Sequence, residues 1–316
     1  MTLIIDPQTG GIAGNMIIGA LVDLGANPEE LKKIMESVTT QFGKVKVNFD
    51  KVNKCGIDST YCNVELLSEN KHIHYKDLIA KIDSLELDEK VKETSKNIFK
   101  RIAIAESKVH GKNLDEIHFH EVGASDAVAD VIGSVYAYYS LNLDKEEVIG
   151  LPVALGGGRV KTAHGILPVP APAVLEILKD INCIGGPVDS ELATPTGCAI
   201  YAELCSEFKK FIPPCKTSKV AYGAGKKDFD FPNVLRVIKT KEITESDQID
   251  VIETNIDHLT GEEIGYLFDK LLEEGASDVS VTPIIMKKNR QGSLLKVIAN
   301  RNKRNHLIEV MFKEIG

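Results

Sequence analysis

The stretch Leu3-Ile4-Ile5-Asp6-Pro7-Gln8-Thr9-Gly10-Gly11-Ile12-Ala13-Gly14-Asn15-Met16 passes from apolar residues into a polar, glycine-rich segment. The apolar run ending at Asp6 predicts a short buried strand, and a helix is expected from the glycines to about Leu24. A strand, a tight turn and a helix are the repeating parts of an α/β domain. Because sites in such domains form at the carboxyl ends of strands, Asp6 is a candidate catalytic residue.

The glycines between Gly10 and Gly14 allow two interpretations. Free backbone N–H groups at a helix start could cradle an anion. Alternatively, a tight turn lets the helix and strand pack closely. The Walker lysine and the Rossmann glycine spacing are both missing, so the sequence favours packing.

A second strand–turn–helix pattern is rich in histidine and acids: His118-Phe119-His120-Glu121-Val122-Gly123-Ala124-Ser125-Asp126-Ala127-Val128-Ala129-Asp130. In a strand the two histidines share one face, and in the helix that follows Asp126 and Asp130 share the face opposite the apolar stripe. Imidazole and carboxylate suit first-row divalent metals, so the candidate metal ligands are His118, His120, Glu121, Asp126 and Asp130. Glu121 is also a candidate catalytic residue. A helix start with a solvated acidic face explains the same residues, and both interpretations stay open.

Two further segments carry candidate ligands. His72 and His74 form a second His-x-His ahead of a predicted helix, and they either bind a metal or are ordinary surface residues. Gly156 to Gly158, followed by Arg159, Lys161 and His164, predicts a loop at which backbone approaches an anionic ligand. His164 is a candidate catalytic residue in that loop.

The composition limits the class of protein. The 316 residues carry 38 Lys and Arg against 46 Asp and Glu, a net charge of −8 that argues against nonspecific nucleic-acid binding. No apolar segment approaches membrane-spanning length, and Met1 to Asp6 predicts a strand rather than a signal peptide. The six cysteines lack a Cys-x-x-Cys pair, which indicates reduced thiols and a cytoplasmic protein without a structural zinc site.

The remaining elements of the first domain follow from caps and periodicity. Residues 45–52 and 57–67 predict a hairpin, 148–155 and 234–238 predict strands, and the glycines of 219–228 predict a turn. Helix N-caps are predicted at Asn27, Asp88, Ser125 and Thr194. The polar residues from about Lys241 to Gln248 indicate a linker.

The last segment predicts strand 249–256, helix 261–273, strands 279–286 and 293–299, and helix 302–312. This order is a ferredoxin-like unit without its last strand. We expect another chain or subunit to cover the open edge, which favours a homo-oligomer. The turn of Lys287, Lys288 and Arg290 could clamp a triphosphate, and Asp257 at the end of the first strand could hold a divalent metal beside it. A solvated charged hairpin is the alternative.

Several motifs occur together, in order, along nearly the whole chain. They are Asp6-Pro7, Gly11 to Met16, His118 to Gly123 with Asp126 and Asp130, Ala163-His164-Gly165, Leu167 to Ala173, Thr194-Pro195-Thr196-Gly197, and Met286 to Arg290. This combination resembles the LarC family, the nickel insertion proteins of nickel-pincer nucleotide cofactor synthesis and lactate racemase maturation.

The resemblance implies a CTP-dependent, metal chelatase-type lyase. Such an enzyme inserts nickel into pyridinium-3,5-bisthiocarboxylic acid mononucleotide, using CTP with Mn²⁺ or Mg²⁺ and releasing CMP and pyrophosphate. It implies an α+β chain with an α/β domain of residues 1–242 handling nickel. A ferredoxin-like domain, 249–316, would bind CTP through Asp257, Lys287, Lys288 and Arg290. The apo-enzyme that receives the cofactor is a further expected partner, whereas nucleic acid and membranes are not.

The sequence departs from the family pattern in three ways. First, Asn15 and His258 stand where the family usually has Asp. Second, His72 and His74 replace a long histidine run. Third, the last strand of the C-terminal domain is missing. Its absence leaves open a nickel-delivery module without CTP turnover, and composition alone also allows a Mg²⁺-dependent phosphate hydrolase.

Overall fold

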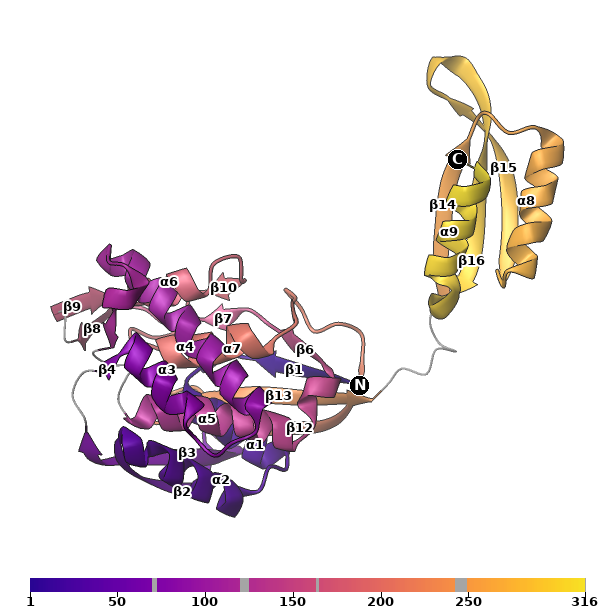
Figure 1. Ribbon diagram of the computed structural model, residues 1–316. Helices are drawn as coiled ribbons and strands as arrows, with labels where there is room; N and C mark the ends of the chain where they lie inside the picture. The colour runs from indigo at the N-terminus through magenta and orange to yellow at the C-terminus, as the bar shows by residue number, and fades with distance from the viewer. Residues whose placement is uncertain (70–72, 120–124, 163–164, 242–248, 316) are drawn as a thin grey trace. The chain divides into compact units, whose positions relative to one another are not determined.

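The fold is that of a computed structural model, which describes residues 1–69, 73–119, 125–162, 165–241 and 249–315 (Figure 1). The chain divides into two compact units, Met1–Glu242 and Ile243–Gly316. Each unit combines helices with strands around its own apolar core. The predicted mixed fold of helices and strands is therefore confirmed.

The first unit is built on a seven-stranded mixed sheet of order β11-β6-β1-β13-β12-β3-β2. Its strands are β1 Thr2–Asp6, β2 Gly43–Lys54, β3 Ile57–Glu69, β6 Glu147–Gly150, β11 Glu207–Phe208, β12 Lys216–Ala224 and β13 Val234–Lys241. Strand β6 is parallel to both β1 and β11, whereas β13 is antiparallel to β1 and β12. The carboxyl end of β1, where Asp6 lies, is thus a point at which α/β proteins place sites.

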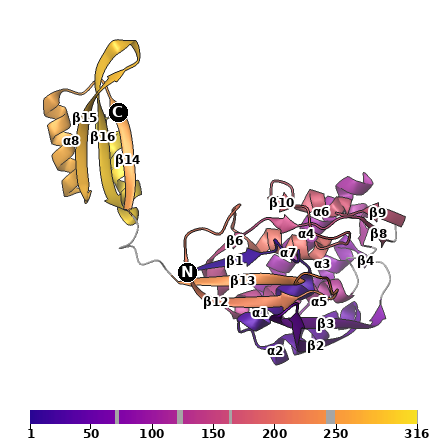
Figure 2. The same cartoon turned by 180° about the vertical axis from the view of Figure 1, so that it is seen from behind.

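Helices pack on one face of this sheet. They are α1 Gly14–Leu24, α2 Pro28–Val38, α3 Tyr75–Asp83, α4 Glu89–His110, α5 Ser125–Ser140, α6 Pro172–Ile177 and α7 Pro195–Leu204. Leu3, Ile5 and Val237 belong to the large core on the helical side, whereas Ile4 and Ile238 form a small separate cluster. The view from behind shows β1, β13 and β12 in front of the helices (Figure 2). Because side chains alternate between the two faces along a strand, Asp6 and Arg236 point to the face of Ile4 and Ile238, away from the large core.

The helix starts follow their local sequences. Asn27 Oδ1 accepts the N–H of Glu29 at 3.1 Å, Asp88 accepts that of Lys90 at 2.8 Å, and Thr194 Oγ1 accepts that of Gly197 at 3.2 Å. These three predicted caps are confirmed. Ser125 is not a cap, because it is already the first residue of α5.

Helix α1 lies unusually close to strands β12 and β3. A Cβ at Gly223 would overlap the carbonyl oxygen of Met16, and one at Gly19 would overlap that of Thr60. At the far end of the helix, Asp23 Oδ2 accepts the N–H of Tyr222 at 2.9 Å. Helix and sheet are therefore joined by backbone contact and by a hydrogen bond to the sheet itself.

Two predicted elements of this unit are wrong. The strand expected over 148–155 is interrupted at Leu151 and Pro152, and its second half, β7 Val153–Ala154, pairs instead with β10 Cys183–Ile184. Proline cannot donate to a sheet ladder, which explains the break. The turn expected over 219–228 is largely strand β12, whose Gly223 serves the contact with α1 rather than a bend.

The second unit has a three-stranded antiparallel sheet of order β14-β16-β15. Its elements are β14 Ile249–Ile256, α8 Gly261–Glu273, β15 Asp278–Met286, β16 Arg290–Asn300 and α9 Arg304–Ile315. Leu267 and Leu271 of α8 and Leu307 of α9 pack against Leu295 and Val297 on one face of the sheet. The predicted order of strand, helix, two strands and helix is confirmed, as is the capping box of Thr260 and Glu263.

Two expectations from composition can also be compared with the fold. All six cysteines are unpaired, as predicted. Within the described ranges, no helix is both long and apolar enough to cross a bilayer.

Candidate functional site

Asp6, the predicted catalytic residue at the end of β1, is buried and hydrogen-bonded on both oxygens. Its Oδ1 accepts the backbone N–H of Gln8 at 3.2 Å and the side-chain amide of Gln8 at 3.0 Å. Its Oδ2 accepts Arg236 Nε at 2.8 Å and also Arg236 Nη2. The Asp6 side chain is 4% exposed and that of Arg236 42%. Arg236 was not singled out from the sequence; the signal was one arginine within an otherwise apolar strand.

Loops distant in sequence meet around the end of β1. Ile12 donates its N–H to Leu192 O at 2.9 Å, Thr194 donates to Ile12 O at 2.9 Å, and Ala154 donates to Pro7 O at 3.1 Å. Gly11, with φ of +70°, lies against the backbone of Leu192 and has no room for a Cβ. The glycines of this turn serve close packing, which is the interpretation that the sequence favoured.

The glycine-rich loop at Gly156 also packs against protein backbone. Gly156 bridges to Glu191, and the N–H of Gly157 is donated to Ser190 O at 3.3 Å. Strands β8 Arg159–Thr162 and β9 Gly165–Pro168 continue it as a hairpin. His164 lies outside the described residues, so its predicted role stays a prediction.

Asp130 of α5 reaches the start of α1. A Cβ at Gly14 would lie 2.5 Å from Asp130 Oδ2, so glycine is required where the carboxylate meets this helix N-terminus. Asp130 Oδ1 is inaccessible to solvent and has no hydrogen-bond partner in the described part of the chain. Burial, together with the charge of Asp126, raises the pKa of Asp130 to about 8, against a hydrogen bond from the Asn15 backbone that lowers it. The predicted solvated acidic face is therefore wrong for Asp130.

The two His-x-His segments are brought together by a short antiparallel ladder. Strand β4 Ile73–His74 pairs with β5 His118–Phe119, so that His74 stands directly opposite His118. Opposite positions in such a ladder have Cα atoms about 4.5–5.5 Å apart. Ile73 and Phe119 are buried and fix the register against the core.

Three other residues of the predicted metal cluster fall in other parts of the chain. His72, His120 and Glu121 lie outside the described residues. Among the described residues, no group of three His, Cys, Asp or Glu side chains is arranged to hold a metal. The structure thus joins His74 with His118 along the backbone, and separately brings Asp130 to the start of α1.

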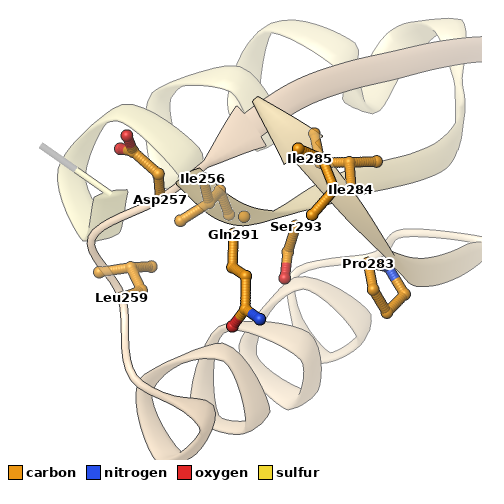
Figure 3. Close-up of a pocket in the computed structure, with 9 residues that line it drawn as sticks. Ile256, Asp257, Leu259, Pro283, Ile284, Ile285, Gln291 and Ser293 are labelled. Carbon is orange, nitrogen blue, oxygen red and sulfur yellow. The ribbon is translucent and has the colours of Figure 1, made fainter. Parts of the chain in front are cut away.

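In the second unit, Asp257 and Arg290 form an ion pair beside an open hollow. Arg290 Nη1 lies 3.4 Å from Asp257 Oδ2, and the Arg290 side chain is 61% exposed. The hollow has a volume of about 610 Å³ and is lined by Ile256, Asp257, Leu259, Pro283, Ile284, Ile285, Gln291, Gly292 and Ser293 (Figure 3). The lining residues Gln291 and Ser293 were not singled out from the sequence, because their positions as alternate residues of β16 depend on the observed register.

Lys287 and Lys288 occupy the turn between β15 and β16 and are not among the residues that line the hollow. Lys288 and Asn289 have φ of +62° and +57°, in the left-handed region. The turn therefore holds two non-glycine residues in a conformation that favours glycine.

Comparison with known proteins identifies the family. Residues 3–316 match the family described as nickel insertion protein, a range that includes both units. The chain belongs to the nickel insertion protein family.

Relatives in this family are similar over almost the whole chain. A protein of Methanosphaera stadtmanae named for nickel insertion is 50% identical over 324 residues, which cover 100% of this chain and 80% of the relative. The pyridinium-3,5-bisthiocarboxylic acid mononucleotide nickel insertion protein of Staphylococcus epidermidis is 42% identical over 305 residues, covering 96% of this chain and 76% of the relative.

One solved structure is also similar in sequence. It is LarC2, the C-terminal domain of a cyclometallase involved in the synthesis of the NPN cofactor of lactate racemase, in its apo form. The match is 40% identical, covers 22% of this chain and 50% of that chain, and has a TM-score of 0.21.

Proposed function

We propose that this member of the nickel insertion family inserts nickel into pyridinium-3,5-bisthiocarboxylic acid mononucleotide, with CTP as co-substrate. The observation that carries the proposal is the β4–β5 ladder, which places His74 opposite His118 although 44 residues separate them in sequence (118 − 74 = 44). Two histidine positions on one short ladder suit a first-row metal. Membership of the family makes nickel the metal to test.

The nickel-handling residues proposed in the first unit are His74, His118, Asp126 and Asp130, with His72, His120 and Glu121 as further candidates. Nickel is a substrate here rather than a resident cofactor. Support for Asp130 comes from its solvent-inaccessible oxygen without a described partner, which a cation would stabilise. Glu121 of the histidine-rich and acidic segment and His164 of the loop after Gly158 are proposed as catalytic residues.

The nucleotide-binding residues proposed in the second unit are Asp257, Lys287, Lys288 and Arg290. Asp257 offers carboxylate oxygens, which are the ligands that Mg²⁺ and Mn²⁺ prefer, so the residue fits a metal-bound triphosphate. When bound, the metal would neutralise phosphate charge. The exposed guanidinium of Arg290 would bind phosphate oxygens, and Asp257 orients it in the free protein.

A complete assay mixes the protein with CTP, Mg²⁺ or Mn²⁺, Ni²⁺ and the bisthiocarboxylated mononucleotide. We expect nickel-loaded product together with CMP and pyrophosphate. Absence of CTP consumption while nickel still binds would contradict the proposal and favour a nickel-delivery module. Turnover of simple phosphoesters with Mg²⁺ alone would favour a hydrolase.

Substitution of Arg290 tests the nucleotide half. We expect Arg290→Gln to weaken CTP binding by about 10-fold or more, because a charge-assisted contact to phosphate is lost. Arg304→Gln is the matched control, since Arg304 Nη1 lies 3.6 Å from Asp250 and is also partly exposed. Titration calorimetry with CTP should show no change for the control; equal loss in both variants would argue against a specific role for Arg290.

A further inference from the structure

The ion pair at the end of β1 occupies only one edge of the Arg236 guanidinium. A guanidinium has two edges that can each bind an oxyanion through two N–H groups. Arg236 uses the edge of Nε and Nη2 for Asp6 Oδ2. Nη1 has no hydrogen-bond partner within the described residues, and the side chain is 42% exposed. The second edge is thus held in a fixed orientation and open to a ligand.

Arg236 is oriented by a buried carboxylate rather than by a surface one. Asp6 is 4% exposed, so the carboxylate that orients the arginine is part of the sheet and not a mobile surface group. Asp6 lies at the carboxyl end of β1, beside the parallel strand β6. Tyr222, half-buried, stands opposite Arg236 in the β12–β13 ladder and shares its face of the sheet. Helices do not cover this face in the view from behind (Figure 2).

We propose that Arg236 binds the phosphomonoester of the mononucleotide substrate, and that Asp6 is the positioning residue that aligns Arg236. This inference rests on the proposed function. The substrate named for the relatives has thiocarboxylates and a phosphate. The thiocarboxylates are the substrate's soft donors and the natural position for the inserted nickel, which leaves the hard phosphate oxygens for a guanidinium. Tyr222, opposite Arg236 in the ladder, is an aromatic residue of the kind that binds cationic groups such as a pyridinium ring.

The test compares a pyridinium-3-carboxylate mononucleotide with the same riboside lacking the phosphate. Titration calorimetry on the full-length protein should show about 10-fold or more tighter binding of the phosphorylated probe. In Arg236→Gln we expect this preference to disappear while riboside binding stays the same. Arg236→Lys keeps the charge without the paired N–H groups and should recover part of the preference. Asp6→Asn should lower the preference without removing the arginine.

Controls separate binding from folding. Arg101→Gln removes a matched arginine, 40% exposed and paired with Glu203 at 2.8 Å, and should keep the full preference. The double variant Asp6→Asn with Arg236→Gln replaces the charged pair by a neutral one, so that no buried carboxylate is left unpaired. Melting temperatures measured on each variant show whether the sheet is intact.

The outcomes for this site and for nickel insertion are distinguishable. Nickel alone, titrated into the same variants, should bind equally well, because the proposed nickel ligands lie elsewhere. An equal affinity of the wild type for both probes would overturn the phosphate site, whatever the insertion assay gives. A folded Arg236→Gln protein that still prefers the phosphorylated probe would overturn it as well. So would an Arg236→Gln protein that loses affinity for CTP alone.

Discussion

At the scale of single residues, Asp130 combines burial, a neighbouring charge and an oxygen without a hydrogen-bond partner among the described residues. Its pKa is raised from 3.8 to about 8 in the folded chain, so near neutral pH the folded state holds a proton that the unfolded state releases. The contribution of Asp130 to the free energy of unfolding is therefore fully present below about pH 4, and it is lost as the pH rises through about 8. Asp130→Asn should remove this part of the pH dependence. Urea midpoints between pH 5 and pH 8 would measure it.

Asp126 provides the control for that measurement. Its charge is the second cause of the shift, so Asp126→Asn should make the slope between pH 5 and pH 8 shallower without abolishing it. Parallel curves for Asp130→Asn and the wild type would mean that Asp130 is already ionised. Bound nickel favours the ionised carboxylate, so nickel should bind more weakly toward acidic pH.

At the scale of elements, the contact of α1 with the sheet depends on two glycines. Gly223→Ala would place a methyl group against the Met16 carbonyl, on rigid backbone on both sides. We expect a loss of about 1–3 kcal/mol in the free energy of unfolding of the first unit. Gly185→Ala is the control, because nothing lies within 4 Å of its Cβ position. Equal denaturation midpoints for both variants would contradict this account of α1.

Helix caps can be predicted from the sequence, whereas packing between elements distant in sequence cannot. Caps at Asn27, Asp88 and Thr194 depend on residues two or three positions away, so the sequence predicts them well. The glycines around Gly223 predict a turn, because the contact of Gly223 with Met16, 207 residues away in sequence (223 − 16 = 207), leaves no local pattern. The apolar run 148–155 predicts one continuous strand, whereas the observed strand is interrupted at Pro152, a residue that cannot donate to a ladder.

The candidate sites show the same division between local and distant contacts. Asp6 follows from its place after an apolar strand, but its partner Arg236 lies 230 residues away and is fixed only by the order of strands. His74 and His118 were each noticed as part of a His-x-His, and their pairing needed the β4–β5 register. Spacing in sequence predicts which side chains share a face of one element. It does not predict which other elements the fold places beside that face.

At the scale of the whole molecule, the two units have separate cores, so we expect each to fold alone. A fragment of residues 1–241 should bind nickel, and a fragment of 249–316 should bind CTP, each with affinity close to that of the intact chain. Insertion should require both parts. Circular dichroism and titration of each fragment would check this. CTP binding by the first fragment would contradict the division of roles.

The turn at Lys288 is a position at which stability and the proposed binding of CTP make opposite demands on one residue. A lysine in the left-handed region costs roughly 1 kcal/mol relative to glycine. Lys288→Gly should therefore raise the melting temperature of the second unit, and the proposed contact of the lysine with the nucleotide predicts a lower affinity for CTP. Selection for thermal stability alone would be expected to replace this lysine, whereas selection for nickel loading would retain it. A screen scored by both properties would separate the two pressures at one position.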